Sequence, residues 1–217
     1  MSAPAADSVS RPSRLPREQR RESVLEAARV VFVRVGYHPT SMDDIAEAAG
    51  VTKPVLYQHF SSKLELYLAV LDQAIDELLA AADKALRSTA DNKLRVQATM
   101  RAYFAFVDAK AGGYQLLFES DVMSQEEVRQ RVDRAHALVA QRIAAVIAED
   151  TDLTESQTLL LGSALQGMAQ VAATRWLADP HEEMTRDNAA DLVAALAWRG
   201  IRGFPLSHPR AAETEAS

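Results

Sequence analysis

The stretch that most constrains the fold is Ser41–Phe60, SMDDIAEAAGVTKPVLYQHF, which has the pattern of two short helices joined by a sharp turn. Gly50 interrupts the pattern at a point where a residue with positive φ is needed. Pro54 falls in the first turn of the second helix, where a missing N–H does no harm. Leu56 and Phe60 are four residues apart, so both are expected to face the core. The spacing therefore predicts a helix-turn-helix, in which the second helix enters the DNA major groove.

The outward positions of the second predicted helix separate this pattern from a purely structural helical corner, which is the alternative interpretation. They carry two rings, an amide and a cation, where a merely solvated face carries mostly Glu and Lys: Lys53, Val55, Tyr57, Gln58 and His59. Such groups suit phosphates and base edges. Thr52 precedes them and is expected to cap the helix. The outer face therefore favours a DNA-reading helix over a structural corner.

The charge of the chain is unevenly distributed, although its net value of −6 at first argues against DNA. Residues 11–63 contain nine Arg or Lys and six Asp or Glu, whereas residues 64–217 contain fifteen and twenty-three. Five arginines follow one another closely near the N-terminus: Arg11, Arg14, Arg17, Arg20 and Arg21. A basic module on an acidic body points to a nucleic-acid partner for the module.

Four segments are expected from the distribution of charge and breaking residues. Residues 1–16 are rich in Ser, Pro and Ala and are expected to form a disordered basic arm, which either reaches the DNA or only solubilises the chain. Residues 17–80 are expected to form the DNA-binding domain and residues 81–205 an effector-binding and dimerisation domain. Residues 206–217 are expected to form a loose tail.

The composition and periodicity indicate an all-α fold. Ala and Leu dominate, the chain has 8 Gly and 8 Pro, and β-branched residues never gather in short alternating runs. The pattern predicts about nine helices, near residues 17–35, 42–49, 53–60, 63–86, 93–111, 114–119, 125–149, 155–178 and 186–202. Three helices are expected to start at capping boxes, namely Ser62 with Glu65, Ser124 with Glu127, and Thr154 with Gln157.

The last two predicted helices, near 155–178 and 186–202, are apolar over more than one face. Such helices are either central to a domain or packed against another chain. We expect them to form a symmetric homodimer interface with two helices from each protomer, because helix-turn-helix proteins usually bind paired half-sites as dimers. A simple core pair is the alternative.

Several classes of function find no support in the sequence. The chain has no Cys, and its five His are scattered without metal-ligand spacing, so no metal site is expected. It has no P-loop, H-E-x-x-H or G-x-S-x-G motif, so neither an enzyme nor a cofactor is expected. No apolar run reaches about 18 residues and the N-terminus lacks the apolar centre of a signal peptide. We therefore expect a cytoplasmic protein with no membrane partner.

The run TSMDDIAEAAGVTKPVLYQHFSSKLEL at Thr40–Leu66 resembles the DNA-binding domain of the TetR family of bacterial regulators. It matches the family pattern of T, IA, AGV, LY, HF, K and L in register, with Pro54 where many members have Gly. The resemblance implies a homodimer that binds a palindromic double-stranded operator and changes its grip when a small molecule enters the C-terminal domain. Carried over by position, the residues expected to hold phosphates are Thr40, Ser41, Thr52, Tyr57, His59 and Lys63. Those expected to face bases are Lys53, Pro54, Val55 and Gln58.

Residues 36–71, together with GGYQLLFESD at 112–121, resemble more narrowly the actinobacterial TetR regulators of fatty-acid synthesis that respond to long-chain acyl-CoA. This likeness implies a small apolar effector such as a long-chain acyl-CoA. The expected ligand-binding residues are Tyr103, Phe104, Val107, Leu117, Phe118, Val139, Ile143 and Gln166. A CoA head also needs cations at the pocket mouth, and those available are Arg101, Lys110, Arg129, Arg131, Arg134 and Arg142. The alternatives are a TetR-type repressor of an efflux pump that senses an apolar drug, and a helical lipid-binding module without DNA function.

Overall fold

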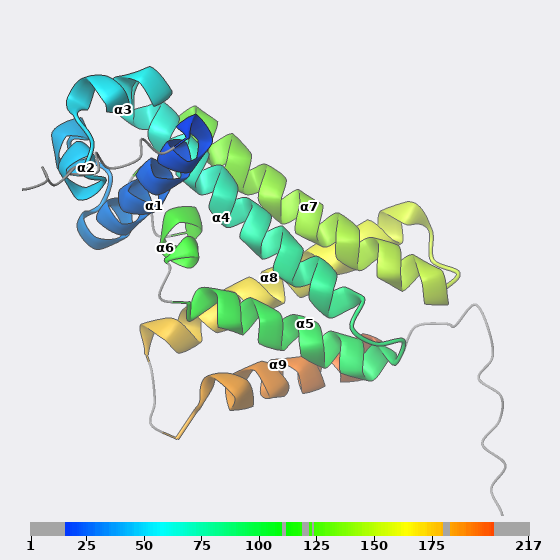
Figure 1. The fold of residues 1–217 in the computed structure, drawn as a ribbon. Helices are drawn as coiled ribbons and strands as arrows, with labels where there is room; N and C mark the ends of the chain where they lie inside the picture. The colour runs from blue at the N-terminus through cyan, green and yellow to red at the C-terminus, as the bar shows by residue number, and fades with distance from the viewer. Residues whose placement is uncertain (1–15, 110–111, 119–121, 123, 180–182, 202–217) are drawn as a thin grey trace, which may run out of the picture.

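The computed structural model describes residues 16–109, 112–118, 122, 124–179 and 183–201 (Figure 1). These residues form nine helices and no strand, which confirms the expected all-α class. The helices are α1 (Arg17–Val35), α2 (Met42–Ala48), α3 (Lys53–His59), α4 (Lys63–Leu86), α5 (Asn92–Val107), α6 (Gly113–Phe118), α7 (Glu126–Asp150), α8 (Glu155–Ala178) and α9 (Arg186–Ile201). Within these ranges no helix is both long and apolar enough to cross a bilayer.

The first three helices gather at one end of α4, which then runs into the larger helical body (Figure 1). In that body α7 packs along α4 and α8, while α9 lies against α5. One hydrophobic core extends without interruption from Val24 in α1 to Ala197 in α9. Because α4 crosses the predicted domain boundary at residue 80 as one continuous helix, both parts of the chain share its apolar face. The domain limits themselves stay predictions.

The turn between α1 and α2 is held by aromatic packing around Tyr67 of α4. Its ring lies edge-on to Phe32 and to Tyr37, with both centroid distances at 5.2 Å. Gly36 ends α1 with φ of 90°, and its N–H donates to the carbonyl of Phe32. Ser41 then starts α2 with a capping box, because its hydroxyl accepts from the N–H of Asp44 and the Asp44 carboxylate accepts from the N–H of Ser41.

Two of the predicted helix starts differ from those observed. The α7 helix begins at Glu126 after Gln125, without a side-chain cap, so the predicted box of Ser124 and Glu127 is wrong. Ser62 caps α4 by accepting from the N–H of Glu65, but the Glu65 carboxylate accepts from Ser61 instead. The reciprocal half of that box is therefore displaced by one residue. At α8 both halves of the Thr154 and Gln157 box are present, which confirms the prediction.

The α5 helix ends at Val107 rather than near residue 111, because the chain must turn there to lead into α6. The N–H of Asp108 still donates to the carbonyl of Phe104, and Ala109 begins a tighter turn by donating to Phe106. Gly112 has φ of 70°, and a Cβ at this position would lie 2.4 Å from a methyl carbon of Val33 in α1. A close approach of this turn to α1 therefore requires glycine.

Candidate nucleic-acid interface and effector pocket

The predicted recognition helix is α3, and the structure gives it an inner and an outer face. Leu56 and the following Phe60 are buried, with exposed fractions of 0% and 1%. Gly50 adopts φ of 63° in the turn before the helix, as predicted. Thr52 is the N-cap residue, but its side chain makes no capping hydrogen bond, so that part of the prediction is wrong. The α2–α3 pair therefore has the geometry of a helix-turn-helix.

The outer face of α3 presents most of the residues expected to read bases and to hold phosphates. Lys53, Pro54, Tyr57 and Gln58 are exposed, whereas Val55 and His59 are half-buried. Ser41 is exposed at the start of α2 and Thr52 at the start of α3. The structure thus brings these eight side chains to one corner of the molecule, and their individual DNA contacts stay predictions.

Lys53 forms an ion pair that the sequence pattern does not predict. Its ammonium lies 2.8 Å from a carboxylate oxygen of Asp43 in α2, and both side chains are more than half exposed. The hydrogen bond to Asp43 raises the pKa of Lys53, so the side chain is a stable cation. A phosphate or a guanine approaching Lys53 must compete with this carboxylate for the ammonium protons.

A basic cluster, formed by Arg17, Arg20 and Arg21 at the start of α1, lies close to the C-terminal end of α3. Arg21 stacks its guanidinium over the Phe60 ring at 5.1 Å. Partial burial, and then repulsion from all three arginines, lowers the pKa of His59. The positive potential at this corner favours a phosphate strand. The remaining arm arginines, Arg11 and Arg14, lie outside the described residues.

Thr40 and Lys63 have structural partners within the protein, in addition to the phosphate contacts expected of them. Thr40 is 2% exposed, and its hydroxyl donates to the carbonyl of Gly36 at 2.7 Å. The Lys63 ammonium donates to the carbonyls of Tyr37, His38 and Thr40, and it lies 4.2 Å from the centre of the Tyr37 ring. Lys63 therefore ties the start of α4 to the turn that precedes α2, and its phosphate contact stays a prediction.

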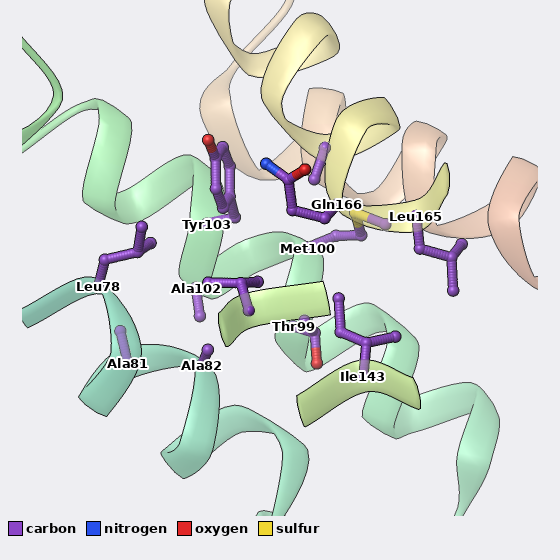
Figure 2. A pocket seen from close by; sticks show the side chains of 12 residues that line it. Leu78, Ala81, Ala82, Thr99, Met100, Ala102, Tyr103, Ile143, Leu165 and Gln166 are labelled. Atoms are coloured by element: carbon purple, nitrogen blue, oxygen red, sulfur yellow. The ribbon is translucent and has the colours of Figure 1, made fainter. Parts of the chain in front are cut away.

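A cavity of about 30 Å³ lies inside the larger helical body, between α4, α5, α7 and α8 (Figure 2). Its lining is apolar except at three residues, of which Gln166 and Tyr103 lie close together in Figure 2. The lining consists of Leu78, Ala81, Ala82, Thr99, Met100, Ala102, Tyr103, Val139, Ile143, Leu165, Gln166 and Ala169. Four of the eight residues expected to bind the ligand are among them, namely Tyr103, Val139, Ile143 and Gln166.

The other expected ligand-binding residues lie in the surrounding core rather than at this cavity. Phe104, Val107 and Leu117 are at most 1% exposed, and the Phe104 ring packs against Trp176 with a centroid distance of 6.0 Å. The side chain of Phe118 lies outside the described residues. Ligand contact by these four residues stays a prediction.

The short helix α6 connects the cavity region to the DNA-binding part. The buried hydroxyl of Tyr67 in α4 donates to the carbonyl of Leu116 in α6 at 3.0 Å. On the other side, the hydroxyl of Tyr114 in α6 donates to Thr174 of α8 at 2.6 Å. Hydrogen bonds of normal length therefore link α6 to both α4 and α8.

Most of the cations considered for a CoA head are engaged with acidic partners. Arg142 of α7 donates to Asp83 of α4 at 2.9 Å, and the two residues are the chain neighbours of Ile143 and Ala82 in the cavity lining. The remaining printed pairs are Arg101 with Asp191, Arg129 with Glu126, and Arg131 with Asp72. Arg134 is exposed, and Lys110 lies outside the described residues. Arg142, next to Ile143, and Arg101, between Met100 and Ala102, are thus the cations nearest in sequence to the cavity lining.

Two apolar stripes remain exposed on the last two helices. On α8 the exposed residues Leu160 and Val171, each 70% exposed, lie on one stripe with Ala164 and Gly167. On α9, Leu192 and Leu196 are 62% and 65% exposed and lie four residues apart. Scattered exposed apolar residues are normal on a monomer, but stripes with helical spacing on adjacent helices indicate a protein contact.

The fold and the exposed α3 face together define a helix-turn-helix DNA-binding protein whose first helices join a larger helical body. Residues 24–70 match the family described as "Bacterial regulatory proteins, tetR family", and residues 93–200 match the "Tetracyclin repressor-like, C-terminal domain". The chain belongs to the TetR family and is a DNA-binding transcriptional regulator, as the sequence resemblance implied.

Individual relatives support this assignment over almost the whole chain. The chain is 40% identical over 197 residues to the HTH-type transcriptional activator FasR of Mycolicibacterium smegmatis, covering 91% of this chain and 90% of that protein. A TetR-like regulator from Rhodococcus sp. RHA1 has a similar crystal structure, with a TM-score of 0.69, 30% identity, and coverage of 88% and 100%. A TetR-family regulator from Streptomyces coelicolor gives a TM-score of 0.68 at 25% identity, with coverage of 86% and 83%. Each of these relatives is named as a transcriptional regulator or activator.

Proposed function

We propose that this regulator binds a palindromic operator as a homodimer joined through α8 and α9, and that a long-chain acyl-CoA changes its operator affinity. The single observation that carries the proposal is the position of the cavity. Leu78, Ala81 and Ala82 of its wall belong to α4, and the same helix anchors the helix-turn-helix through Lys63. A ligand that moves this wall also moves the DNA-reading unit.

The size of the cavity makes such a movement necessary. A volume of about 30 Å³ is far below the roughly 300–1,000 Å³ of ordinary ligand pockets. An acyl chain must therefore push the surrounding helices apart, and α4 forms one side of the space. The 24 residues of α4 span about 36 Å, so a small tilt at the cavity is amplified at α3. In a dimer this changes the spacing of the two recognition helices, which must match about one helical turn of DNA.

The lining supports an apolar chain as the ligand. Among its residues only Tyr103, Gln166 and Thr99 bear polar side-chain groups, and none bears a charge at neutral pH. A charged ligand group buried among these residues would have no partner of opposite charge, which would cost roughly several kcal/mol. The narrower sequence resemblance and the FasR relative point to the same class of regulator. Since that relative is an activator, we propose activation as the sign of regulation here.

The dimer proposal rests on the exposed stripes of α8 and α9. Leu192→Glu places a carboxylate in the proposed interface and should convert the dimer to a monomer, as measured by sedimentation velocity. Leu94→Glu is the matched control, because Leu94 of α5 is 51% exposed but lies outside both stripes. Leu94→Glu should leave the mass unchanged. A wild-type monomer, or a Leu192→Glu dimer of unchanged affinity, would show that α9 does not form the interface.

The DNA-binding proposal is tested by selection from a random duplex pool. We expect a palindromic sequence whose affinity falls steeply with salt concentration, because phosphate contacts release counterions. Gln58→Ala should change the preference at one base position, whereas Lys63→Ala should weaken binding to all sequences alike. If the two variants act identically across operator variants, the division into base-reading and positioning residues is wrong.

A further inference from the structure

Tyr103 has a buried hydroxyl group for which the described part of the chain provides no hydrogen-bond partner. The residue is 6% exposed, and its oxygen forms no hydrogen bond with any of the described residues. Gln166, which is 8% exposed, faces it from α8, and in Figure 2 the carboxamide is directed toward the tyrosine ring. The Gln166 amide nitrogen donates to the Gln170 side chain at 3.1 Å.

An unpartnered buried hydroxyl lowers the stability of the protein in which it is found. Phenylalanine would fill nearly the same volume without a desolvated polar atom, so a tyrosine here is unfavourable for the empty protein. Burial also raises the pKa of the Tyr103 hydroxyl above its usual range, so the group stays a neutral donor at all physiological pH values. Its proton is available to an acceptor that is absent from the empty cavity.

We propose that Tyr103, assisted by Gln166, is the polar anchor of the effector site and donates a hydrogen bond to the carbonyl oxygen of an acyl thioester. The inference rests on the proposed acyl-CoA function and specifies which atom of the ligand is recognised. The acyl chain lies along the apolar wall, and the thioester carbonyl marks the point where the chain meets its polar head.

The absence of charge in the described lining selects a neutral carbonyl over a carboxylate. No Lys, Arg or His contributes to the cavity, so a free fatty acid would bring an uncompensated negative charge into an apolar space. The charged part of a CoA head lies beyond the cavity, where Arg142 exchanges its Asp83 partner for a phosphate. The site therefore distinguishes an acyl thioester from the corresponding fatty acid.

A single buried water is the competing explanation for the hydroxyl. A cavity of about 30 Å³ is large enough to hold one water molecule, which needs roughly 10–15 Å³ on this measure. A structural water would stabilise the empty protein through Tyr103. If Tyr103 is instead the ligand anchor, its hydroxyl lowers the stability of the empty protein and forms a favourable hydrogen bond only when the ligand is bound. The two explanations predict opposite effects of removing the hydroxyl.

The test combines Tyr103→Phe with two ligands that differ only at the carbonyl. Palmitoyl-CoA has the thioester carbonyl, whereas S-hexadecyl-CoA has a thioether and no carbonyl. Calorimetric titration of the full-length protein should show that Tyr103→Phe weakens palmitoyl-CoA binding about tenfold, equivalent to ~1.4 kcal/mol, and leaves S-hexadecyl-CoA binding unchanged. The melting temperature of the ligand-free variant should equal or exceed that of the wild type.

Tyr114→Phe is the matched control, because the Tyr114 hydroxyl already has a partner in Thr174. This change should lower the melting temperature and leave the ratio of the two ligand affinities unchanged. Equal weakening of both ligands by Tyr103→Phe, or no weakening of either, would overturn the anchor alone. A lower melting temperature of ligand-free Tyr103→Phe with unchanged affinities would assign the hydroxyl to a buried water. Failure of the wild type to bind either ligand would overturn the acyl-CoA proposal together with the anchor.

Discussion

The ion pair between Arg29 of α1 and Glu77 of α4 is expected to be costly to break, because one of its two partners is buried. Arg29 is almost completely buried, with a side-chain exposure of 7%, whereas Glu77 is 49% exposed. The pair is bidentate, with Nη2 of Arg29 donating to Oε2 of Glu77 at 2.7 Å and Nη1 donating to the other oxygen. The hydrogen bond to Glu77 raises the pKa of Arg29. Glu77→Ala removes the carboxylate to which this buried guanidinium donates two hydrogen bonds.

The expected cost lies between two limits. Breaking a fully buried pair costs about 3–5 kcal/mol, and breaking an exposed pair costs about 0–1 kcal/mol. Because half of the Glu77 side chain faces water, we expect Glu77→Ala to lower the free energy of unfolding by about 2 kcal/mol. For a chain of this size, 1 kcal/mol corresponds to about 2–4 °C, so the melting temperature should fall by about 4–8 °C.

Calorimetry and urea unfolding of wild type and variants provide the assay. Asp72→Ala is the matched control, since the pair of Arg131 and Asp72 also joins two helices but has side-chain exposures of 37% and 54%. The control should lower the melting temperature by no more than about 4 °C. Replacing Arg29 and Glu77 together by Met and Leu should restore most of the loss. Equal small shifts in Glu77→Ala and Asp72→Ala would refute the argument from burial.

Three further predictions follow from individual contacts. Gly162→Ala should destabilise the protein by about 1–3 kcal/mol in urea unfolding, because its Cβ would lie 2.3 Å from a backbone oxygen of α7. Gly200→Ala is the control, because a Cβ at Gly200 would meet nothing within 4 Å, and this change should be neutral or stabilising by up to about 1 kcal/mol. Equal losses of stability in the two variants would contradict the argument that α7 and α8 pack too closely at Gly162 for a Cβ. Lys63→Met should lower stability by about 1–2 kcal/mol through the loss of its carbonyl partners, and an unchanged melting temperature would remove its structural role. The pKa of His59 is lowered in the free protein, so the folded state binds fewer protons than the unfolded state and stability rises with pH through the range below about 6.5. A phosphate beside His59 favours its protonated form, so operator affinity should rise as pH falls from 8 to 6, by at most about tenfold per unit, and His59→Gln should abolish this dependence.

The local pattern predicted the helix-turn-helix because each of its signals is contained in a few adjacent residues. Gly50 with positive φ and buried Leu56 and Phe60 depend only on the helical repeat and on backbone sterics. The partners of Lys63 could not be read in this way, because Tyr37 and Thr40 lie more than twenty residues earlier. The same applies to Arg29 and Glu77, which are separated by 48 positions.

The effector domain was less predictable because its residues are arranged by packing between distant helices. Helical spacing predicted that Tyr103, Phe104 and Val107 face inward, which they do. Helical spacing does not predict which inward-facing residues line a cavity. Of these three residues, only Tyr103 lines the cavity between α4, α5, α7 and α8. The turn after α5 brings Gly112 against Val33, a contact between segments about eighty residues apart that the local pattern does not show.

The central claim is that a ligand in the cavity changes the affinity of α3 for operator DNA. The most direct test is to measure operator affinity with and without the effector. Fluorescence anisotropy of a labelled operator should be recorded at fixed salt concentration with palmitoyl-CoA, with free CoA and with no addition. We predict that palmitoyl-CoA changes the operator Kd by at least about fivefold, as expected for a coupling of about 1 kcal/mol or more, and that free CoA has no effect. An unchanged operator Kd across a series of acyl-chain lengths would contradict the account, and a change caused by an apolar drug alone would favour the efflux-pump alternative.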